Sequence, residues 1–337
     1  MEQKLLNNGI KIPILGMGTD KVSDGEDVYN QIKSAIKIGY RLIDTAELYH
    51  NETGIGRAIK DCINEGICKR EDLFIQTKAP FHFSGYNNTY KGCLESLERL
   101  GLDYVDMYLI HHPYRDSFFW DREVIDIWRA MENLYKEGKV KAIGVCNFNT
   151  EHLSFLLKEA EIKPMLNQIE FHPQHQKKAV IKFCKENNIT LQGWGTLNQG
   201  RFLNEPMFEE IAQKYNKTPA QIAIRYSIQN EFVPLIRTTR EDRMVEEINV
   251  FDFELTSEDI DKLNLLDGGE NSNNHMDKSV VKQNTDYHPV KYSRSYKLFN
   301  FIPILTKKRF GWNKTKWFLF GFIPLLKTWT KEMGDCK

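Results

Sequence analysis

The feature that most constrains the fold is a regular alternation of short apolar runs with longer segments of helical period. Seven runs are clear, and Gly16–Thr19 is a weaker eighth; the seven are Leu42–Asp44, Leu73–Lys78, Val105–His111, Ala142–Val145, Leu166–Glu170, Thr190–Trp194 and Phe232–Arg237. The helical segments between them include Val28–Ile38, Asn88–Leu100, Val124–Lys136, Glu151–Ala160 and Ala179–Asn187. Strands that alternate with helices are joined by crossovers and are therefore parallel. The chain is expected to be an α/β protein.

Two α/β architectures compete for this pattern. Roughly eight units in roughly 250 residues fit a closed (β/α)8 TIM barrel. An open doubly wound sheet would usually carry GxGxxG after its first strand, and here the first run offers only GMGTDK. The barrel is therefore favoured. KLLNNGIKIPIL predicts an N-terminal β-hairpin with Asn8-Gly9 in its turn, and Thr218 with Gln221 predicts a capping box on a late helix.

Charge and cysteine content narrow the cellular context. The 337 residues have 41% hydrophobic content and no formal net charge, which suits a large soluble core and gives no basic surface for nucleic acid. The six cysteines have no CxxC spacing, so we expect reduced thiols in a cytoplasmic protein without a metal site. Neither a signal peptide nor an apolar run of membrane-spanning length is present in the sequence.

Polar residues occupy the ends of three consecutive predicted strands. Asp44, Lys78 and His111 each end an apolar run, 34 and 33 residues apart, and Tyr49 follows Asp44 in the loop before a helix-like run. A barrel directs the carboxyl ends of its strands to one rim, where its active site lies. Each residue alone has an ordinary structural interpretation, but four together predict a catalytic group.

The four side chains are suited to donating a proton to a carbonyl oxygen. A tyrosine with a pKa near ~10 is a weak acid. An ammonium about 4 Å from the phenol favours the phenolate by about 4 kcal/mol at an effective dielectric of ~20, equal to roughly three pKa units. Asp44 would keep Lys78 charged, and His111 would orient the substrate oxygen. Because no metal cluster or activated Ser or Cys accompanies them, the attacking species is expected to be a hydride from a cofactor.

At these residues the sequence resembles the aldo-keto reductases, from about residue 4 to residue 268. The matching stretches are ILGMGTDK, GYRLIDTAELYHNETGIGRAI, LFIQTKAP, YVDMYLIHHP, KVKAIGVCNF, LNQIEFHP and VFDFEL. The resemblance implies a (β/α)8 barrel that reduces aldehydes or ketones with NADPH. It also implies that Asp44, Tyr49, Lys78 and His111 are the catalytic residues.

The resemblance also implies a set of residues that bind NADPH. Cys146, Asn147 and Gln168 match the residues that hold the carboxamide, although the family has Ser where Cys146 stands, and Trp194 matches the aromatic that stacks on the nicotinamide. Arg237, Thr238 and Arg243 match the 2′-phosphate site, with Arg for a family Lys, and Glu246 and Glu247 are expected beside the adenine. The remaining cofactor residues are Thr19, Asp44, Gly195 and Leu197. The next residue, Thr196, stands where the family often has Pro, so a looser pyrophosphate loop is expected.

Two departures from the family concern the substrate. Several members have Trp where this chain has Asp20 and where it has His112. An acid and an imidazole make the mouth of the site polar. A polyhydroxylated or charged carbonyl substrate, such as a sugar derivative, is therefore expected rather than a lipid aldehyde.

The resemblance ends near residue 268, and the rest of the chain differs in composition. Residues 269–290 are polar and predict a linker. Residues 291–337 hold eleven Lys and Arg and two Asp and Glu. Of the 46 basic and 46 acidic residues in the chain, residues 1–290 therefore hold 35 and 44. The tail is basic and the rest of the chain is acidic. This tail contains a twofold repeat, YKLFNFIPIL at Tyr296–Leu305 and WFLFGFIPLL at Trp317–Leu326, and it resembles tails of some bacterial surface-polysaccharide enzymes.

Several interpretations of the tail and of the function stay open. The tail could bind an anionic membrane at its inner face, bind a protein partner, or dock on the barrel. A non-catalytic, nucleotide-binding adaptor or regulatory subunit is the alternative to an enzyme. Alcohol oxidation by the same residues is a further alternative, because the sequence does not determine the direction of the reaction in vivo.

Overall fold

The computed structural model describes residues 2–79, 85–113 and 120–269, together with the backbone of four strands between residues 293 and 329. The chain divides into two compact units, Met1–Ser272 and Asn273–Lys337. The predicted linker at 269–290 lies, apart from Gly269, outside the described residues.

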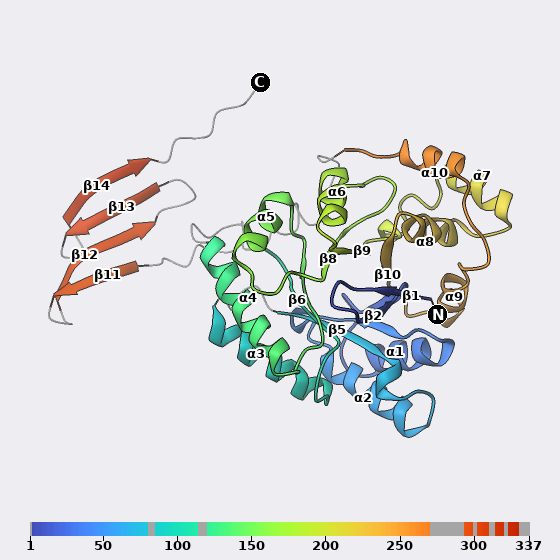
Figure 1. The fold of residues 1–337 in the computed structure, drawn as a ribbon, viewed down its shortest axis with the longest axis horizontal. Helices are drawn as coiled ribbons and strands as arrows, with labels where there is room; N and C mark the ends of the chain where they lie inside the picture. Colours follow the sequence, from blue (N-terminus) through green and yellow to red (C-terminus); the bar gives the residue numbers. More distant parts are fainter. Residues whose placement is uncertain are drawn as a thin grey trace. The chain divides into compact units, whose positions relative to one another are not determined.

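The first unit is a closed barrel of eight parallel strands, which confirms the predicted (β/α)8 fold. Its strand order is β10-β3-β4-β5-β6-β7-β8-β9, so every strand lies beside its neighbours in sequence, and β10 closes the barrel by pairing with both β9 and β3. Figure 1 shows these strands with helices around them. The strands are β3 (Gly16–Gly18), β4 (Leu42–Asp44), β5 (Phe74–Ala79), β6 (Met107–Ile110), β7 (Ile143–Cys146), β8 (Leu166–Glu170), β9 (Thr190–Trp194) and β10 (Phe232–Ile236). All eight coincide with the apolar runs of the sequence, including the weak run at Gly16.

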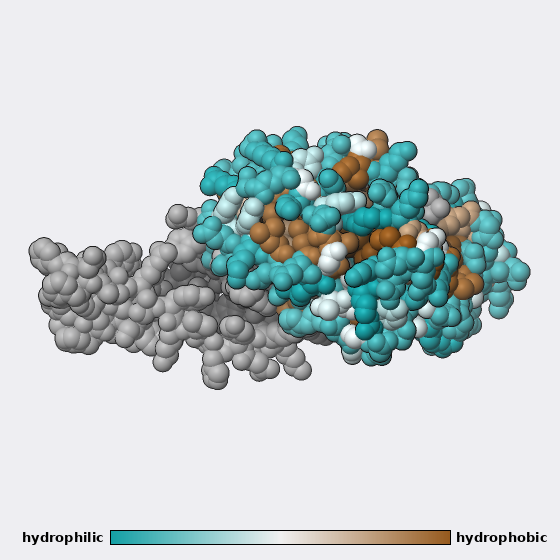
Figure 2. Space-filling model, turned by 90° about the horizontal axis from the view of Figure 1, so that it is seen from below, coloured by the Kyte–Doolittle hydropathy of each residue, from teal (hydrophilic) through white to brown (hydrophobic). Residues whose placement is uncertain are grey.

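Helices pack around the outside of the barrel. They are α1 (Glu26–Ile38), α2 (Glu52–Asn64), α3 (Tyr86–Leu100), α4 (Trp120–Lys136), α5 (Thr150–Glu159), α6 (Lys178–Glu186), α7 (Pro206–Tyr215), α8 (Pro219–Gln229), α9 (Glu241–Ile248) and α10 (Ser257–Asn264). The predicted capping box forms at the start of α8, where Gln221 N donates to Thr218 Oγ1 at 3.3 Å and Thr218 N donates to Gln221 Oε1 at 3.0 Å. Figure 2 shows a mainly hydrophilic surface with hydrophobic residues gathered in the middle of one face.

The N-terminal hairpin forms, but its turn differs from the expected one. Strand β1 (Gln3–Leu5) pairs antiparallel with β2 (Lys11–Pro13). Only Gly9 takes a positive φ, of 85°, and its N–H donates to Leu6 O at 2.9 Å. The Asn8 side chain accepts from Ile10 N and donates to Lys141 O. The turn is therefore a longer loop with a left-handed glycine rather than a two-residue Asn-Gly turn.

The second unit is a four-stranded antiparallel sheet in the order β11-β12-β13-β14. Its strands are β11 (Ser293–Leu298), β12 (Ile302–Arg309), β13 (Lys314–Leu319) and β14 (Ile323–Trp329). In the first hairpin Tyr296 pairs with Leu305, and in the second Trp317 pairs with Leu326. The twofold sequence repeat therefore corresponds to two hairpins with the same pairing register, 21 residues apart.

Close packing of α2 against the end of α3 requires a glycine in α2. A Cβ atom placed on Gly56 would lie 2.3 Å from the Leu100 carbonyl oxygen and 2.8 Å from its Cα atom. Backbone atoms cannot give way as the end of a flexible side chain can. The two helices would have to separate to accept any larger residue.

We expect Gly56→Ala to lower the free energy of unfolding by about 1–3 kcal/mol, because overpacking at this contact outweighs the better helix propensity of alanine. Thr53→Ala, at an exposed position of the same helix, is the control and should change stability by less than about 0.5 kcal/mol. Urea unfolding followed by circular dichroism measures both variants. Equal stability of the two would contradict the packing argument.

Candidate active site

The structure brings the four predicted catalytic residues together at the carboxyl ends of β4, β5 and β6. Asp44 is the last residue of β4, Lys78 lies near the end of β5, and His111 follows β6 directly. Tyr49 ends a short 3-10 helix, Glu47–Tyr49, in the loop after β4. Lys78 Nζ lies 3.3 Å from the Tyr49 hydroxyl, and the rings of Tyr49 and His111 meet edge to face at 5.7 Å.

Lys78 is wholly buried and is held by oxygen atoms. Its ammonium donates to both carboxylate oxygens of Asp44 at 2.8 Å and to the Thr45 carbonyl oxygen at 2.9 Å. Burial by itself would lower the pKa of Lys78, but the Asp44 carboxylate more than offsets this and the pKa is raised. Lys78 therefore carries its charge at neutral pH.

The balance at Tyr49 differs from the one expected from sequence. Burial raises the pKa of the Tyr49 phenol, and Lys78 opposes this shift, while Asp44 and Asp20 add to it. Lys78 thus acts in the predicted direction, but desolvation is the larger effect. The consequence is that the phenol keeps its proton at neutral pH, as a proton donor must.

The loop that carries Tyr49 is anchored by Asn51, which the sequence reasoning did not single out. Asn51 is wholly buried, and its side-chain amide donates to the carbonyl oxygens of Thr19 and Val22, at 2.9 and 3.0 Å. Its Oδ1 accepts from Thr45 Oγ1 at 2.9 Å. Asn51 therefore fixes the β4 loop against the loop after β3.

A cluster of three buried glutamines, Gln76, Gln168 and Gln192, surrounds one oxygen of Asp44. Gln76 and Gln168 each donate to Asp44 Oδ1, at 2.5 and 2.9 Å, and each donates to Gln192 Oε1 at 2.8 Å. We call these three residues the glutamine cluster. The sequence held a signal for it, because Gln76 and Gln192 lie two residues before Lys78 and Trp194 and so share their faces of β5 and β9.

The residues expected to hold the nicotinamide lie on β7, β8 and β9. Cys146 is buried, which raises the pKa of its thiol, and its Sγ lies 3.3 Å from Gln168 Oε1. Asn147, with a left-handed φ of 63°, accepts from Trp194 Nε1 at 3.0 Å. These four side chains form one connected group beside Asp44.

The segment after β9 combines left-handed residues with a buried anchor. Gly195, Asn198, Gln199 and Gly200 all have positive φ, while Leu197 is partly buried between them. The Thr196 hydroxyl is buried and lies 3.3 Å from the Leu235 carbonyl oxygen. The N–H groups of Asn198 and Gly200 donate to the carbonyl oxygens of Gly195 and Leu197, both at 2.7 Å, so the segment is a series of tight turns.

Cationic and acidic side chains follow β10. Arg237 and Arg243 are exposed, and the Arg237 guanidinium donates to the Asp20 carbonyl oxygen at 3.2 Å. Thr238 is buried, and Glu246 accepts from Thr218 Oγ1 at 2.6 Å. Burial raises the pKa of Glu247 to about 7, with a further contribution from Glu246.

Three further candidates lie close to the catalytic group. Thr19 is buried, and both its N–H and its hydroxyl donate to the Asp44 carbonyl oxygen, at 3.1 and 3.0 Å. Asp20 is exposed at the rim, and its charge acts on Tyr49. The His112 ring stacks on His111 at 4.6 Å and lies 3.0 Å from Asn147 Nδ2.

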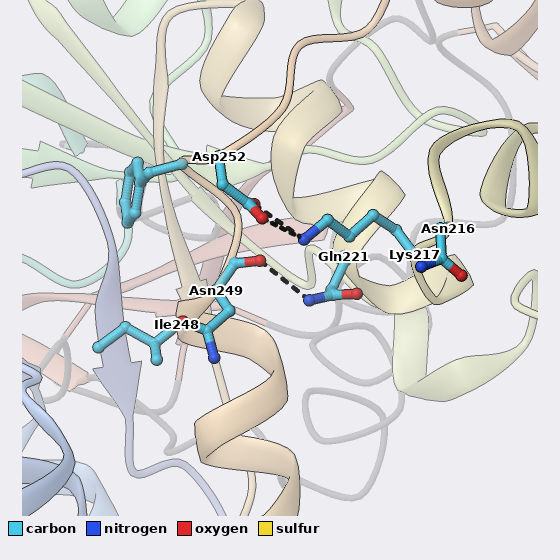
Figure 3. Close-up of a pocket in the computed structure, with 7 residues that line it drawn as sticks. Asn216, Lys217, Gln221, Ile248, Asn249 and Asp252 are labelled. Carbon is cyan, nitrogen blue, oxygen red and sulfur yellow. Dashed lines mark hydrogen bonds and ion pairs between the residues drawn. The ribbon is translucent and has the colours of Figure 1, made fainter.

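A separate pocket of about 490 Å³ lies where α8 meets the segment after α9 (Figure 3). Lys217 pairs with Asp252 there at 2.7 Å, and Gln221 donates to the Asn249 carbonyl oxygen at 2.9 Å. Its lining includes none of the candidate residues. Within the described part of the chain, no helix has the length and apolar character needed to cross a membrane.

Comparison with known proteins agrees with this geometry. The family model described as "Aldo/keto reductase family" matches residues 14–267. Glyoxal reductase of Bacillus subtilis is 45% identical over 265 residues, covering 79% of this chain and 92% of that protein. The 9,11-endoperoxide prostaglandin H2 reductase of Trypanosoma cruzi is 42% identical over 265 residues, covering 77% and 90%.

Solved structures show the same likeness. The deep-sea metagenome aldo-keto reductase MGS-M4 superimposes with a TM-score of 0.74 at 41% identity, covering 79% of this chain and 95% of that one. Bombyx mori aldo-keto reductase AKR2E4, solved in complex with NADP, superimposes with a TM-score of 0.76 at 29% identity, covering 82% and 96%. The resemblance noted in the sequence is thus confirmed: this chain belongs to the aldo-keto reductase family.

Proposed function

We propose that the protein reduces an aldehyde or ketone to an alcohol with NADPH, and that Tyr49 donates the proton. The observation that carries this proposal is the contact of 3.3 Å between the Tyr49 hydroxyl and Lys78 Nζ, with Lys78 bound to both oxygens of Asp44. A protonated phenol beside a fixed positive charge is suited to protonating an oxygen that becomes negative. General acid catalysis of this kind is typically worth ~10²–10⁴ in rate.

Each member of the group has a distinct part in this proposal. Tyr49 hands its proton to the substrate oxygen, and Lys78 stabilises the phenolate that is left. Asp44 holds Lys78 in its charged form and in place. His111, whose ring meets the Tyr49 ring edge to face, donates a hydrogen bond that orients the substrate carbonyl.

The residues present fit NADPH, which would supply the hydride when bound. Gln168 and Asn147 would hold the carboxamide, and Cys146 would support Gln168 through its thiol. Trp194 would lie against the nicotinamide, and the left-handed segment from Gly195 would face the pyrophosphate. The exposed guanidinium groups of Arg237 and Arg243, with Thr238 beside them, would hold the 2′-phosphate. Glu246 and Glu247 would lie at the adenine.

The substrate is proposed to be polar or sugar-like. Support comes from Asp20 and His112 at the rim, because both offer hydrogen bonds where aromatic side chains would offer apolar contact. His112 stacked on His111 also extends the polar surface away from the proton donor. A pocket built for hydroxyl groups rejects ligands without them, since its polar groups would stay unpaired.

Tyr49→Phe should lower kcat for carbonyl reduction about 10²–10⁴-fold and leave the Kd for NADPH within about twofold, because only the proton donor is removed. NADPH oxidation by stopped flow and nucleotide fluorescence measure the two quantities. Tyr90→Phe, whose hydroxyl bonds Glu137 on the surface, is the matched control and should keep full activity. A wild-type protein that binds NADPH but turns over no carbonyl would instead favour the adaptor.

Arg237→Ala should raise the KM for NADPH about 10–100-fold while the KM for NADH changes little, because a charged hydrogen bond to phosphate is worth about 1.5–3 kcal/mol. Arg240→Ala is the control, since Arg240 lies in the same segment and pairs with Asp242. Steady-state kinetics with both cofactors provide the comparison. Equal effects on NADPH and NADH would show that Arg237 does not contact the 2′-phosphate.

The wild-type enzyme should reduce sugar-like carbonyls with a higher kcat/KM than aliphatic aldehydes of equal chain length. Asp20→Leu should shift this ratio about tenfold toward the aliphatic aldehydes, since hydrogen bonds to hydroxyl groups are lost. Asp20→Asn keeps a hydrogen-bonding side chain without the charge, and it should retain most of the preference. A wild-type preference for aliphatic aldehydes would contradict the polar substrate.

The tail is proposed to bring the enzyme to the inner face of an anionic membrane. Support comes from its composition: residues 291–337 contain eleven Lys and Arg, only two acidic residues, and aromatic residues among them. Basic side chains are attracted to anionic lipids. Replacing Lys307, Lys308 and Arg309 with Gln should weaken sedimentation with anionic vesicles by about 3 kcal/mol, roughly a hundredfold. Lys182→Gln on the barrel is the control. If the full chain stays in the supernatant at low salt, the membrane hypothesis is wrong and the protein-partner hypothesis remains.

A further inference from the structure

Four strands place polar side chains at one level inside the barrel, around Asp44. Asp44 pairs in register with Gln76 on the neighbouring strand, and Gln168 pairs in register with Gln192. Gln76, Gln168 and Gln192 are 0%, 2% and 0% exposed. Buried amides of this kind are costly unless their hydrogen bonds are satisfied. Their arrangement therefore has to be decided by the bonds that they share.

The hydrogen bonds determine which way two of the amides face. Gln76 Nε2 and Gln168 Nε2 each have two hydrogens, and each amide directs one to Asp44 Oδ1 and one to Gln192 Oε1. The single carbonyl oxygen of Gln192 thus accepts from both. If either amide turned over, its carbonyl oxygen would face the Asp44 carboxylate, where two acceptors repel each other.

We propose that Gln192 is a positioning residue, whose carbonyl oxygen orients the amides of Gln76 and Gln168 so that both donate to Asp44. This inference rests on the proposed function, because it concerns the group that holds Lys78 beside Tyr49. Within the described residues Gln192 makes no hydrogen bond to Tyr49 or Lys78, and it acts through the carboxylate that fixes the ammonium.

Gln192 also connects the two halves of the site. Gln168 is proposed to hold the carboxamide of NADPH, and its amide nitrogen is shared between Asp44 and Gln192, while its Oε1 accepts from Cys146. When Gln192 is replaced by an apolar residue, both amides lose an acceptor. Asp44 alone then holds the two amides, so their orientation is less firmly fixed and two of the three hydrogen bonds at Oδ1 are weakened.

The test compares Gln192→Met with Gln192→Glu. The Gln192 amide nitrogen is buried with no hydrogen-bond partner in the described residues. Replacing the amide by a neutral carboxyl group therefore loses no hydrogen bond and keeps the carbonyl oxygen that accepts from Gln76 and Gln168. We expect Gln192→Met to lower kcat about 10–100-fold and to raise the Kd for NADPH several-fold. It should also move the alkaline limb of the kcat/KM pH profile to higher pH by about one unit, because a less firmly held Lys78 lowers the pKa of Tyr49 less. Gln192→Glu should restore most of kcat at pH 6–7.

Gln176→Met is the matched control for stability. Gln176 is also buried, and its amide donates two hydrogen bonds, to the carbonyl oxygens of Pro173 and Asn264, away from the cluster. Gln176→Met should lower the melting temperature about as much as Gln192→Met does, and it should leave the kcat/KM pH profile unchanged. An unmoved pH profile in Gln192→Met, with only the melting temperature lowered, would reduce Gln192 to a structural residue and overturn the proposal.

A second pair of variants covers the case in which Gln192→Met does not fold. Gln76→Met should then move the alkaline limb to higher pH, and Gln192→Glu should leave it in place. Equal loss of activity in Gln192→Glu and Gln76→Met would overturn the proposal. Turnover by the wild-type enzyme tests the proposed function separately. The Kd for NADPH can be measured without turnover, so the two failures are distinguishable.

Discussion

The ion pair of Asp44 and Lys78 is the interaction on which the site depends. Lys78 has no exposed surface and the Asp44 side chain is 6% exposed, so neither charge could stay there alone. Removing one partner of such a pair typically costs about 3–5 kcal/mol. The pair forms because β4 and β5 are neighbours in the barrel, which sets the two side chains at the same rim. Pairing of β4 with β5 therefore also brings Asp44 and Lys78 together.

Burial around this pair has opposite consequences for its neighbours. It raises the pKa of Tyr49, which keeps the phenol protonated, while Lys78 limits that rise and stands ready to stabilise the phenolate. Burial would discharge Lys78 if Asp44 were absent. Asp44 bonds the glutamine cluster as well as Lys78, so the amides that hold the carboxylate in place also affect the charge beside Tyr49. The protonation states here depend on how completely water is excluded and on which charges remain.

The residues that differ from the family pattern include a buried position, Cys146, and an exposed one at the rim, Asp20. Cys146 takes a position that is usually Ser and still contacts Gln168. Asp20 at the rim binds Arg237 through its carbonyl oxygen and acts on Tyr49 through its charge. The same short segment therefore adjoins both the proposed phosphate site and the proposed substrate mouth. The proposed polar substrate therefore depends on residues at the rim and not on the four residues at the strand ends.

The sequence by itself determined the barrel, its strands to within two residues, and the identity of the four residues at the rim. These follow from local periodicity and from a spacing of about one β/α unit. Tertiary structure alone decided the net pKa shift of Tyr49, because burial depends on every neighbouring element. It also decided that Gln76, Gln168 and Gln192 meet, since they come from strands far apart in the chain. The Asn8 side chain of the hairpin turn likewise bonds Lys141 at a distance of 133 residues along the chain, a contact that no local pattern encodes.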